Sequence, residues 1–497
     1  MNRTTIILMA ITVLSKLLGL VREKVLGFFF GVSRISDAYV ITNTITVTVF
    51  ALIGTAIVTG YIPMFNKIMA KTGEKTADIF TDKLLTLFTM VCAVLSAIIA
   101  IFAEPVVLFF AKGFSGEILD LTVLLVRISI ISIIFSLFTS VFSSYLNIKG
   151  SYVIPMLTGF PLNICYIASF FLAKKYSLLH LAIGNIAAYL SQAIFLYIFV
   201  IKKRPHIIPN FSLKDENLKM LIVIALPAII GISVNKVNVI VDKTLASDIA
   251  GGVSALNYAD KINLLVQGVF TTPLVTLFYP KFSLLFNQKN HKAMQNVLKS
   301  FMTQVILLLL PSTLAVMAFS EDIISITFRG GKFQDNAVNL TSGALFFYGA
   351  GFLFFALREL LSKAFYALED TKTPMINGAC GVFLNIGLNL LLVKSMGING
   401  LAFATSVTSF ATGGALVLLF WKKTGILGLR GCLKDIIKIS AMSVMAVGAA
   451  YLTDIFFKAR GFSVLISFVP AAAVGAAIYL GFMMYFGYFN FKKRIRA

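Results

Sequence analysis

The sequence predicts an all-α polytopic membrane protein with about fourteen transmembrane helices. Of its 497 residues, 58% are hydrophobic and 13% are charged, whereas roughly 25% of the residues of a soluble domain are charged. Apolar runs long enough to cross a bilayer recur along the whole chain. An internal repeat divides most of them into two pseudo-symmetric six-helix halves around a central cavity, and two C-terminal helices follow.

Polar residues, glycines and prolines separate the individual spans. We expect spans at 4–30, 36–62, 84–111, 121–147, 153–173, 178–201, 218–246, 251–279, 296–319, 339–367, 373–394, 398–421, 434–456 and 463–489. The first span begins like a signal peptide, with a basic residue before an apolar stretch. It has no small-residue cleavage site, and its apolar run continues toward Lys24, so we interpret it as a retained helix.

Basic residues gather in alternate connections between the spans. "NKIMAKTGEK", "WKKTGILGLRGCLKD" and the C-terminal "FKKRIRA" are rich in lysine and arginine, whereas "ASDIAGG" contains neither. Cytoplasmic loops carry such an excess, which places the even-numbered connections and both termini in the cytoplasm. The same topology accounts for the net charge of +22 without a nucleic-acid partner.

The repeat is visible around several prolines. "YIPMFNK" after the second span resembles "FYPKFSL" after the eighth, and "GSYVIPML" resembles "EDTKTPMI" at nearly the same offset. An even number of helices gives both halves the same orientation, as in transporters whose substrate cavity lies between the halves. We predict an N-lobe at 1–201, a cytoplasmic linker at 202–217, a C-lobe at 218–421, and a segment at 422–497 with the last two helices and a basic tail.

Five charged residues within or beside the spans indicate a polar cavity. Lys16, Arg22 and Glu23 lie in the first helix, Asp37 begins the second and Lys261 lies in the eighth. Charges inside membrane helices usually face water or the bundle interior and mark substrate paths. Cationic residues suit an anionic substrate, because arginine can bind two phosphate oxygens at once. Alternatively, these residues only stabilise helix packing or reach the membrane interface.

A second polar group consists of Asp242, Asn385, Asn389 and Thr405. Asn385 and Asn389 are four residues apart and share a helix face. One carboxylate, two amide oxygens and a hydroxyl are hard ligands, which suit a small alkali or alkaline-earth cation. Asparagine and threonine also form hydrogen bonds between membrane helices, so the residues alone leave both interpretations open.

Two features concern the second half of the chain. Arg358, Glu359 and Lys363 fall on nearly one helix face, and Glu359 and Lys363 are four residues apart. We expect a structural or gating ion pair there, near the cytoplasmic end. The last two spans are rich in glycine and alanine, which allows close helix packing or a groove for an acyl or prenyl chain.

Signals for an enzyme are lacking in the sequence. It contains no HExxH, GxSxG or Walker motif and no DDxxD-like metal cluster. The four cysteines are scattered, which argues against a zinc site or a disulfide framework. We therefore expect a transporter that hydrolyses no ATP itself and needs no cofactor, apart from a candidate coupling ion.

Several motifs together resemble the MurJ (MviN) family of lipid II flippases, in the multidrug/oligosaccharidyl-lipid/polysaccharide (MOP) exporter superfamily. They are "SKLLGLVREKVLGFFFG", "SDAYV", "NVIVDKTLAS", "SALNYADKI", "RGGKF" and "AFYALEDTKTP". The resemblance implies export of an undecaprenyl-pyrophosphate-linked disaccharide pentapeptide, lipid II, from the inner to the outer leaflet by alternating access. It also implies a role in peptidoglycan biosynthesis and cell shape, and a monomer in the bacterial cytoplasmic membrane that contacts membrane lipids.

The resemblance also suggests roles for the charged residues. Lys16, Arg22 and Lys261 match arginines that bind the pyrophosphate in the family, and Asp37 matches a functional acidic residue. A further arginine of the second helix has no counterpart near Val49. This difference keeps alternatives open: a flippase for another lipid-linked glycan, such as a capsule or O-unit precursor, or an ion-coupled small-molecule exporter. A membrane glycosyltransferase, ligase or scaffold is a more distant alternative.

A sodium site of the family falls on five positions of this chain. They are Asp242, Asn385, Asn389, Leu401 by its carbonyl, and Thr405. The second acidic ligand of the family is here Asn389, which predicts weaker sodium binding. The last two helices resemble those that form the groove for the lipid tail in the family.

Overall fold

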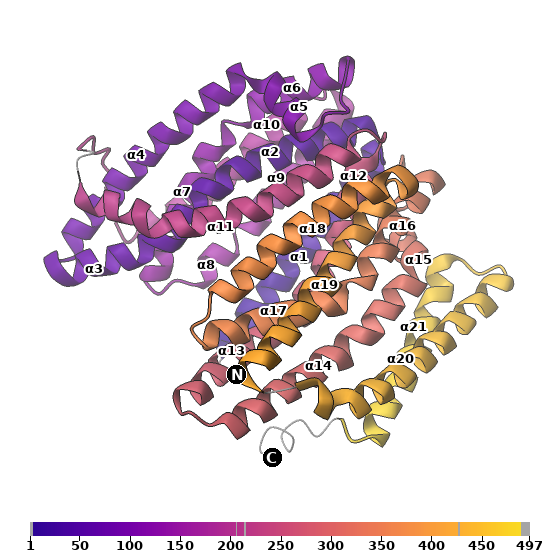
Figure 1. Ribbon diagram of the computed structural model, residues 1–497. Coiled ribbons are helices and arrows are strands. Elements are labelled where there is room, and N and C mark those ends of the chain that lie inside the picture. The colour runs from indigo at the N-terminus through magenta and orange to yellow at the C-terminus, as the bar shows by residue number, and fades with distance from the viewer. Residues whose placement is uncertain (1–2, 205, 213–214, 426–427, 489–497) are drawn as a thin grey trace. The chain divides into compact units, whose positions relative to one another are not determined.

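The computed structural model describes residues 3–204, 206–212, 215–425 and 428–488, and these are almost entirely helical (Figure 1). The helices are α1 (Arg3–Phe30), α2 (Arg34–Ala56), η1 (Ile57–Tyr61), α3 (Ile62–Thr72), α4 (Glu74–Ile101), α5 (Ala103–Phe110), α6 (Glu117–Ser129), α7 (Ser132–Ile148), α8 (Val153–Met156), α9 (Gly159–Lys175), α10 (His180–Ile201), α11 (Glu216–Ala246), α12 (Gly252–Val266), η2 (Gln267–Thr271), α13 (Thr272–Asn287), α14 (His291–Ala318), α15 (Ser320–Phe328), α16 (Asp335–Ala350), α17 (Phe352–Ala367), α18 (Lys372–Met396), α19 (Ile398–Thr424), α20 (Gly428–Ala459) and α21 (Val464–Tyr485). The predicted all-α class is confirmed.

Many of these helices, alone or together with the helix that continues them, are long and apolar enough to cross a membrane. In the described part of the chain 11 helices meet that description, or up to 13 if each bent pair forms one span. The bent pairs are α6 with α7, at 42°, and α16 with α17, at 44°. The chain is therefore an integral membrane protein, as predicted. The total of fourteen spans stays a prediction.

The helices form two compact units. The first unit holds Met1–Ser254 and Gly330–Phe333, and the second holds Ala255–Arg329 and Gln334–Ala497. The first unit thus includes α11, which the sequence repeat places in the C-lobe. Contact density and sequence repetition are different criteria, so the lobe boundaries inferred from the repeat stay a prediction.

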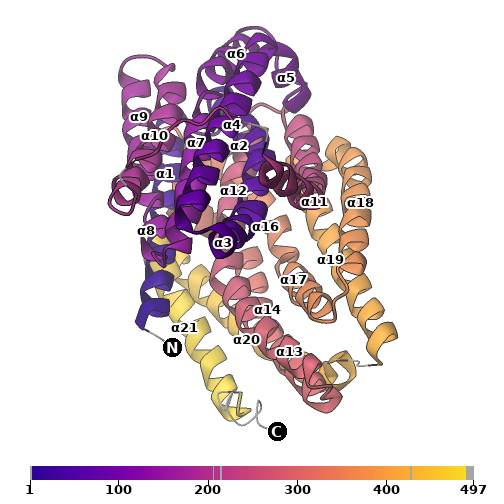
Figure 2. The same cartoon turned by 90° about the vertical axis from the view of Figure 1, so that its left-hand side faces the viewer.

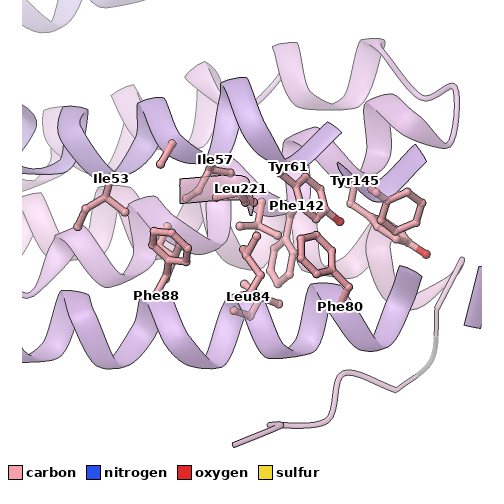
Figure 3. Close-up of a cluster of buried hydrophobic side chains, with 14 of the residues drawn as sticks. Ile53, Ile57, Tyr61, Phe80, Leu84, Phe88, Phe142, Tyr145 and Leu221 are labelled. Carbon is pink, nitrogen blue, oxygen red and sulfur yellow. The ribbon is translucent and has the colours of Figure 1, made fainter. Parts of the chain in front are cut away.

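The first unit contains a densely packed aromatic and aliphatic core. Tyr61 of η1 faces Phe80 of α4, and Ile57 of η1 and Leu221 of α11 lie in the same cluster (Figure 3). The rings of Tyr61 and Phe80 stack with centroids 6.3 Å apart. A Cβ atom on Gly60 would lie 2.8 Å from Cγ of Leu221. Glycine at that position therefore lets α11 approach η1 closely, as small residues do in membrane helices.

Two π-helical turns interrupt corresponding spans of the repeat. The first, η1 (Ile57–Tyr61), lies between α2 and α3, and the second, η2 (Gln267–Thr271), lies between α12 and α13. A proline stands at the start of the helix that follows each of them, at Pro63 and Pro273. Such π-turns are rare and occur mostly as single turns, often at functional sites.

The loop after α10 is tied to the start of α4. Arg204 forms an ion pair with Asp82, and Lys83 Nζ lies 2.8 Å from Asp215 Oδ2. Asp215 also accepts a 2.8 Å hydrogen bond from the Asn217 amide at the start of α11. Burial raises the pKa of Asp215, but the bonds from Lys83 and the Asn217 amide outweigh it and lower the pKa below its usual value. These contacts tie Arg204, just after α10, and Asp215, just before α11, to α4.

In the second unit, α20 and α21 lie side by side and α20 packs against α14 (Figure 2). Near the start of α20, Ile439 packs with Leu307 of α14 and Met483 of α21. The Tyr479 hydroxyl donates a 2.6 Å hydrogen bond to the Leu307 carbonyl. Pro311 lies inside α14, one turn beyond Leu307. The last two helices are therefore packed onto the rest of the second unit.

A glycine determines the turn between α1 and α2. Gly31 has φ +65°, and a Cβ atom there would lie 2.6 Å from the carbonyl oxygen of Lys332. The Lys332 amide donates a 2.9 Å hydrogen bond to the carbonyl of Phe28. The "RGGKF" segment therefore packs directly on the end of α1, and only a glycine fits beneath it.

We expect the substitution Gly31→Ala to destabilise the protein. A left-handed backbone costs an alanine about 1–2 kcal/mol, and the contact with the Lys332 carbonyl adds to this cost. Gly150 has a similar φ of +76°, but a Cβ atom there would meet no described atom within 4 Å. Gly150→Ala therefore has the backbone strain alone. In thermal unfolding of purified protein, Gly31→Ala should unfold at a clearly lower temperature than Gly150→Ala; equal temperatures would contradict the role of the packing.

Candidate functional site

Arg22 and Glu23 of α1 form a partly buried ion pair. Arg22 Nη2 lies 2.5 Å from Glu23 Oε1, and Glu23 is only 3% exposed. The guanidinium of Arg22 also lies over the ring of Tyr166 in α9, 5.0 Å from its centre. A buried charge needs a partner and hydrogen bonds. The structure therefore provides Arg22 with a carboxylate on one side and an aromatic face on another.

A polar network from three further helices continues from this pair. The hydroxyl of Tyr166 and Nδ2 of Asn185 in α10 each donate to Oδ1 of Asn43 in α2, both at 3.3 Å. Nδ2 of Asn43 donates to the Tyr39 hydroxyl at 3.3 Å. The sequence analysis missed these residues, although asparagine and tyrosine within apolar spans were a usable signal. Within the described part of the chain, Nε of Arg22 and Oδ1 of Asn185 are buried without hydrogen-bond partners. Each of these two atoms can therefore form a hydrogen bond with a ligand.

The other two predicted cationic residues differ in their exposure. Lys16 is an exposed residue of α1 in the first unit, whereas Lys261 is half-buried on α12 in the second unit. Next to Lys261, Asp260 Oδ1 accepts a 3.0 Å hydrogen bond from Asn263 Nδ2. Asn263 Oδ1 accepts a 2.7 Å bond from Gln267, the first residue of η2. A polar chain therefore runs along α12 from Asp260 to the π-turn.

Asp37 joins the start of α2 to the start of α12. Its two carboxylate oxygens accept hydrogen bonds from the amides of Gly251, at 2.8 Å, and Ser254, at 2.7 Å. The first amides of a helix lack partners within the helix, and its positive end favours an anion. Asp37 is fully buried and caps α12 from another helix. Nearby, Arg34 donates a 2.6 Å hydrogen bond to the Ser247 carbonyl.

Four of the five candidate sodium ligands lie together in the second unit. Asn389 Nδ2 donates to Asn385 Oδ1 at 2.8 Å, and Asn385 Nδ2 approaches Thr405 Oγ1 at 3.5 Å. Thr405 Oγ1 donates to the Leu401 carbonyl at 3.2 Å. Such amide, hydroxyl and carbonyl oxygens fit the donor set that an alkali cation requires. The fifth residue, Asp242, lies half-buried on α11 in the first unit.

The charged residues of α17 make different contacts from the expected pair. Arg358 Nη2 lies 3.9 Å from Glu359 Oε1, and both side chains are partly exposed. The guanidinium of Arg358 lies over the ring of Phe355 at 5.0 Å, and Lys363 lies over Tyr366 at 5.4 Å. Glu359 is thus paired with its neighbour Arg358 rather than with Lys363. A gating role for this group stays a prediction.

An apolar pocket of about 350 Å³ lies between α14, α15, α20 and α21. Val266, the last residue of α12, and Phe270 in the π-turn η2 also line it. The lining residues include Val266, Phe270, Pro311, Phe319, Ala450, Ala472, Ala476 and Tyr479. Apolar cavities of this kind bind hydrocarbon and exclude water. The pocket lies where the sequence predicts a groove for an acyl or prenyl chain.

The fold and these sites define a class of membrane transporter. A MATE-family multidrug resistance transporter of the MOP superfamily, solved in an inward-facing conformation, matches 85% of this chain and 98% of its own, with TM-score 0.70 and 14% identity. That likeness establishes the fold alone. The family described as "Lipid II flippase MurJ" matches residues 27–470. The chain belongs to this family, as the sequence motifs predicted.

Individual relatives agree with this assignment over nearly the full length. A probable lipid II flippase MurJ from Rickettsia prowazekii is 27% identical and covers 98% of this chain and 96% of its own. The lipid II flippase MurJ from Burkholderia cenocepacia is 26% identical and covers 98% of both chains. A solved lipid II flippase MurJ in an inward closed conformation matches 97% of this chain and 98% of its own, with TM-score 0.80 and 25% identity.

Proposed function

We propose that this chain carries lipid II from the inner to the outer leaflet of the bacterial cytoplasmic membrane by alternating access. Family membership supports this function, and one observation in the site carries it. A partly buried arginine, Arg22, is held by Glu23 and Tyr166, and its buried Nε has no hydrogen-bond partner among the described residues. A guanidinium that is oriented but not saturated suits a phosphate oxygen.

Transfer of the polar headgroup is the difficult part of this reaction. A pyrophosphate and its sugars lose hydration on entering hydrocarbon, and each unpaired charge there is costly. Arg22, Lys16 and Lys261 would replace water around the pyrophosphate. The amides and hydroxyls beside Arg22 would serve the sugars, which both donate and accept hydrogen bonds. The chain thereby lowers the barrier without chemical change to the substrate, which is consistent with a transporter rather than an enzyme.

The undecaprenyl tail needs no such compensation because it stays in an apolar environment. The pocket between α14, α20 and α21 is lined almost entirely by carbon. We assign a segment of the tail to this pocket. The tail would then anchor the substrate while the headgroup changes sides.

Alternating access requires contacts that form and break between states. Asp37 on the α12 amides and Arg34 on Ser247 join the start of α2 to the turn between α11 and α12 through a few directional bonds, which makes them suitable for reversible closure. Sodium, the membrane potential or both would bias the two states. Asp242, Asn385, Asn389, Leu401 and Thr405 would hold the sodium ion, whose binding would compensate the Asp242 charge.

Rescue of a bacterium depleted of its own lipid II flippase tests this function. We expect the wild-type chain to restore growth and the exposure of lipid II on the outer leaflet. Failure of a well-expressed, membrane-inserted protein would overturn the assignment. It would instead favour the second candidate, a flippase for another lipid-linked glycan, which the absence of an arginine near Val49 supports.

Filling the apolar pocket should slow transport of the natural substrate. We expect an Ala472→Phe/Ala476→Phe double variant to lose most activity, because both residues line the pocket and two aromatic rings would occupy the space for the tail. Ala473→Phe is the matched control, since Ala473 is an exposed residue of the same helix outside the lining. Lipid II exposure in the rescue strain measures both. Equal activity of the two proteins would exclude the pocket from transport.

We also propose that the chain works as a monomer with both termini in the cytoplasm, which the basic connections support. Labelling of single cysteines from each side of the membrane tests the orientation. A residue in "WKKTG", at the end of α19, should react only from the cytoplasmic side. Mass measurement of the protein in a lipid nanodisc tests the oligomeric state.

A further inference from the structure

A second charge cluster, with two buried aspartates and an exposed lysine, lies where α20 ends and α15 begins. Lys458 Nζ lies 2.6 Å from Asp322 Oδ1 and 2.7 Å from Asp454 Oδ2. Asp454 and Lys458 are one turn apart on α20, and Asp322 is in the first turn of α15. All three residues belong to the second unit. The cluster is separate from the candidate substrate and sodium sites.

The cluster has one negative charge in excess, because two carboxylates share a single ammonium. The Asp454 side chain is 2% exposed and that of Asp322 is 10% exposed. Oδ1 of Asp454 is buried without a hydrogen-bond partner among the residues that the structure describes. A buried carboxylate oxygen that lacks a partner loses its hydration without compensation. One more positive charge beside Asp454 would therefore stabilise the cluster.

The described residues nearby do not supply that charge. Glu321, beside Asp322, is exposed and adds a further negative charge. Arg460 lies over the ring of Phe456, 3.9 Å from its centre. The start of α16 brings Asp335, which pairs with Arg329 at 2.5 Å. The sequence of α21 and the last four turns of α14 contain no Asp, Glu, Lys, Arg or His.

We propose that Asp322 and Asp454 form a binding site for one proton. Two carboxylates held on the same ammonium lie close together, and like charges in such a pair favour uptake of a proton by one of them. The proton comes from water and bonds to a carboxylate oxygen, so the cluster becomes neutral. In agreement, burial raises the pKa of Asp322 although Lys458 opposes this change.

Protonation of this site would act on the apolar pocket. Phe319 and Ile323 flank Asp322 on the α15 side and line the pocket, and Ala450, one turn before Asp454, lines it from α20. The ion pairs of Lys458 hold these two walls together. A proton on one carboxylate weakens that attraction, so the walls separate more readily at low pH. This inference does not depend on which lipid the chain transports.

Infrared difference spectroscopy of the purified protein in nanodiscs tests proton binding directly. During a pH titration, we expect wild-type protein to show the carbonyl band of a protonated carboxyl group that Asp454→Asn lacks. Glu321→Gln, which alters the exposed neighbour, should retain the band. Identical spectra for wild type and Asp454→Asn would overturn the proposal and leave the cluster a permanently ionised helix contact. Asp322→Asn is measured in parallel, in case Asp454→Asn does not fold.

A labelling experiment tests the effect on the pocket. In a background without native cysteines, Ala476→Cys reports from the pocket wall and Ala473→Cys from outside it. We expect an uncharged maleimide, with rates corrected for thiolate fraction, to react faster with Ala476→Cys as the pH falls. The same change should disappear in the Asp454→Asn background and at Ala473→Cys. A rate at Ala476→Cys that does not depend on Asp454 would contradict coupling between the proton site and the pocket.

Discussion

An Arg22→Gln/Glu23→Gln double variant should fold but fail to restore lipid II export. The side chain of Arg22 is 15% exposed, and its buried, unpartnered Nε is the structural basis for its assignment to the pyrophosphate. Glutamine keeps hydrogen-bonding capacity at both positions but removes both charges. A phosphate would then meet a neutral amide in a low-dielectric site, where charge-assisted hydrogen bonds are roughly twice as strong as neutral ones. Growth of the depleted strain and lipid II exposure measure the loss.

The double substitution separates binding from stability. Arg22→Ala alone leaves Glu23 charged at 3% exposure, and breaking a buried pair in this way costs about 3–5 kcal/mol. A failed rescue by that single variant could therefore reflect unfolding. As a matched control, Arg329→Gln/Asp335→Asn removes an exposed pair whose side chains are 48% and 72% accessible and should behave as wild type. Wild-type export by the Arg22/Glu23 double variant would exclude the pair from substrate binding.

Asp37→Ala should reduce both stability and transport. The carboxylate caps α12 through two amide bonds at 2.8 and 2.7 Å, and hydrogen bonds to a charged group make a net contribution of about 1.5–3 kcal/mol. Alanine would leave the Gly251 and Ser254 amides buried without this acceptor. We expect the free energy of unfolding to fall by about 2–3 kcal/mol, with strongly reduced lipid II exposure.

Two further variants make the Asp37 test specific. Asp37→Asn keeps one acceptor oxygen and should be intermediate in stability, because it loses the charge and one of the two bonds. Asp335→Ala removes an exposed aspartate from the start of another helix, α16, and should unfold close to the wild-type temperature. Thermal unfolding in detergent gives all four values. An Asp37→Ala protein as stable as Asp335→Ala would show that the cap is dispensable.

Much of the fold could be predicted because hydropathy is a local property of the chain. The long apolar runs correspond to helices, and "YALEDTKTP" has a local structural explanation. Asp370 accepts hydrogen bonds from the amide and hydroxyl of Thr373, at 2.9 and 2.7 Å, and pairs with Lys423. The Lys423 ammonium, followed by the Thr373 amide, lowers the pKa of Asp370 to about 2. The motif thus fixes the start of α18 with residues whose spacing is readable in the sequence.

The candidate site was only partly predictable because its partners are distant in the chain. Asp37 was recognisable as an unusual charge, but the amides that it caps lie 214 and 217 residues further on. Tyr166 and Asn185 meet Asn43 across more than a hundred residues. Periodicity assigns a residue to a helix face, but not to the particular neighbour that the face meets. The tertiary contacts therefore had to come from the structure.

The π-turns change the angular phase of their spans. An α-helix advances about 100° per residue, and a π-turn accommodates one extra residue, so the side chains beyond η1 are rotated relative to an unbroken helix. Met64, Phe65 and Ile68 of α3 are buried in that rotated phase, beside the aromatic core of the first unit. One continuous span can thus present different faces to different neighbours. The residue count through η1 and η2 is therefore constrained more strictly than in a surface loop, where an inserted or deleted residue changes only the local path.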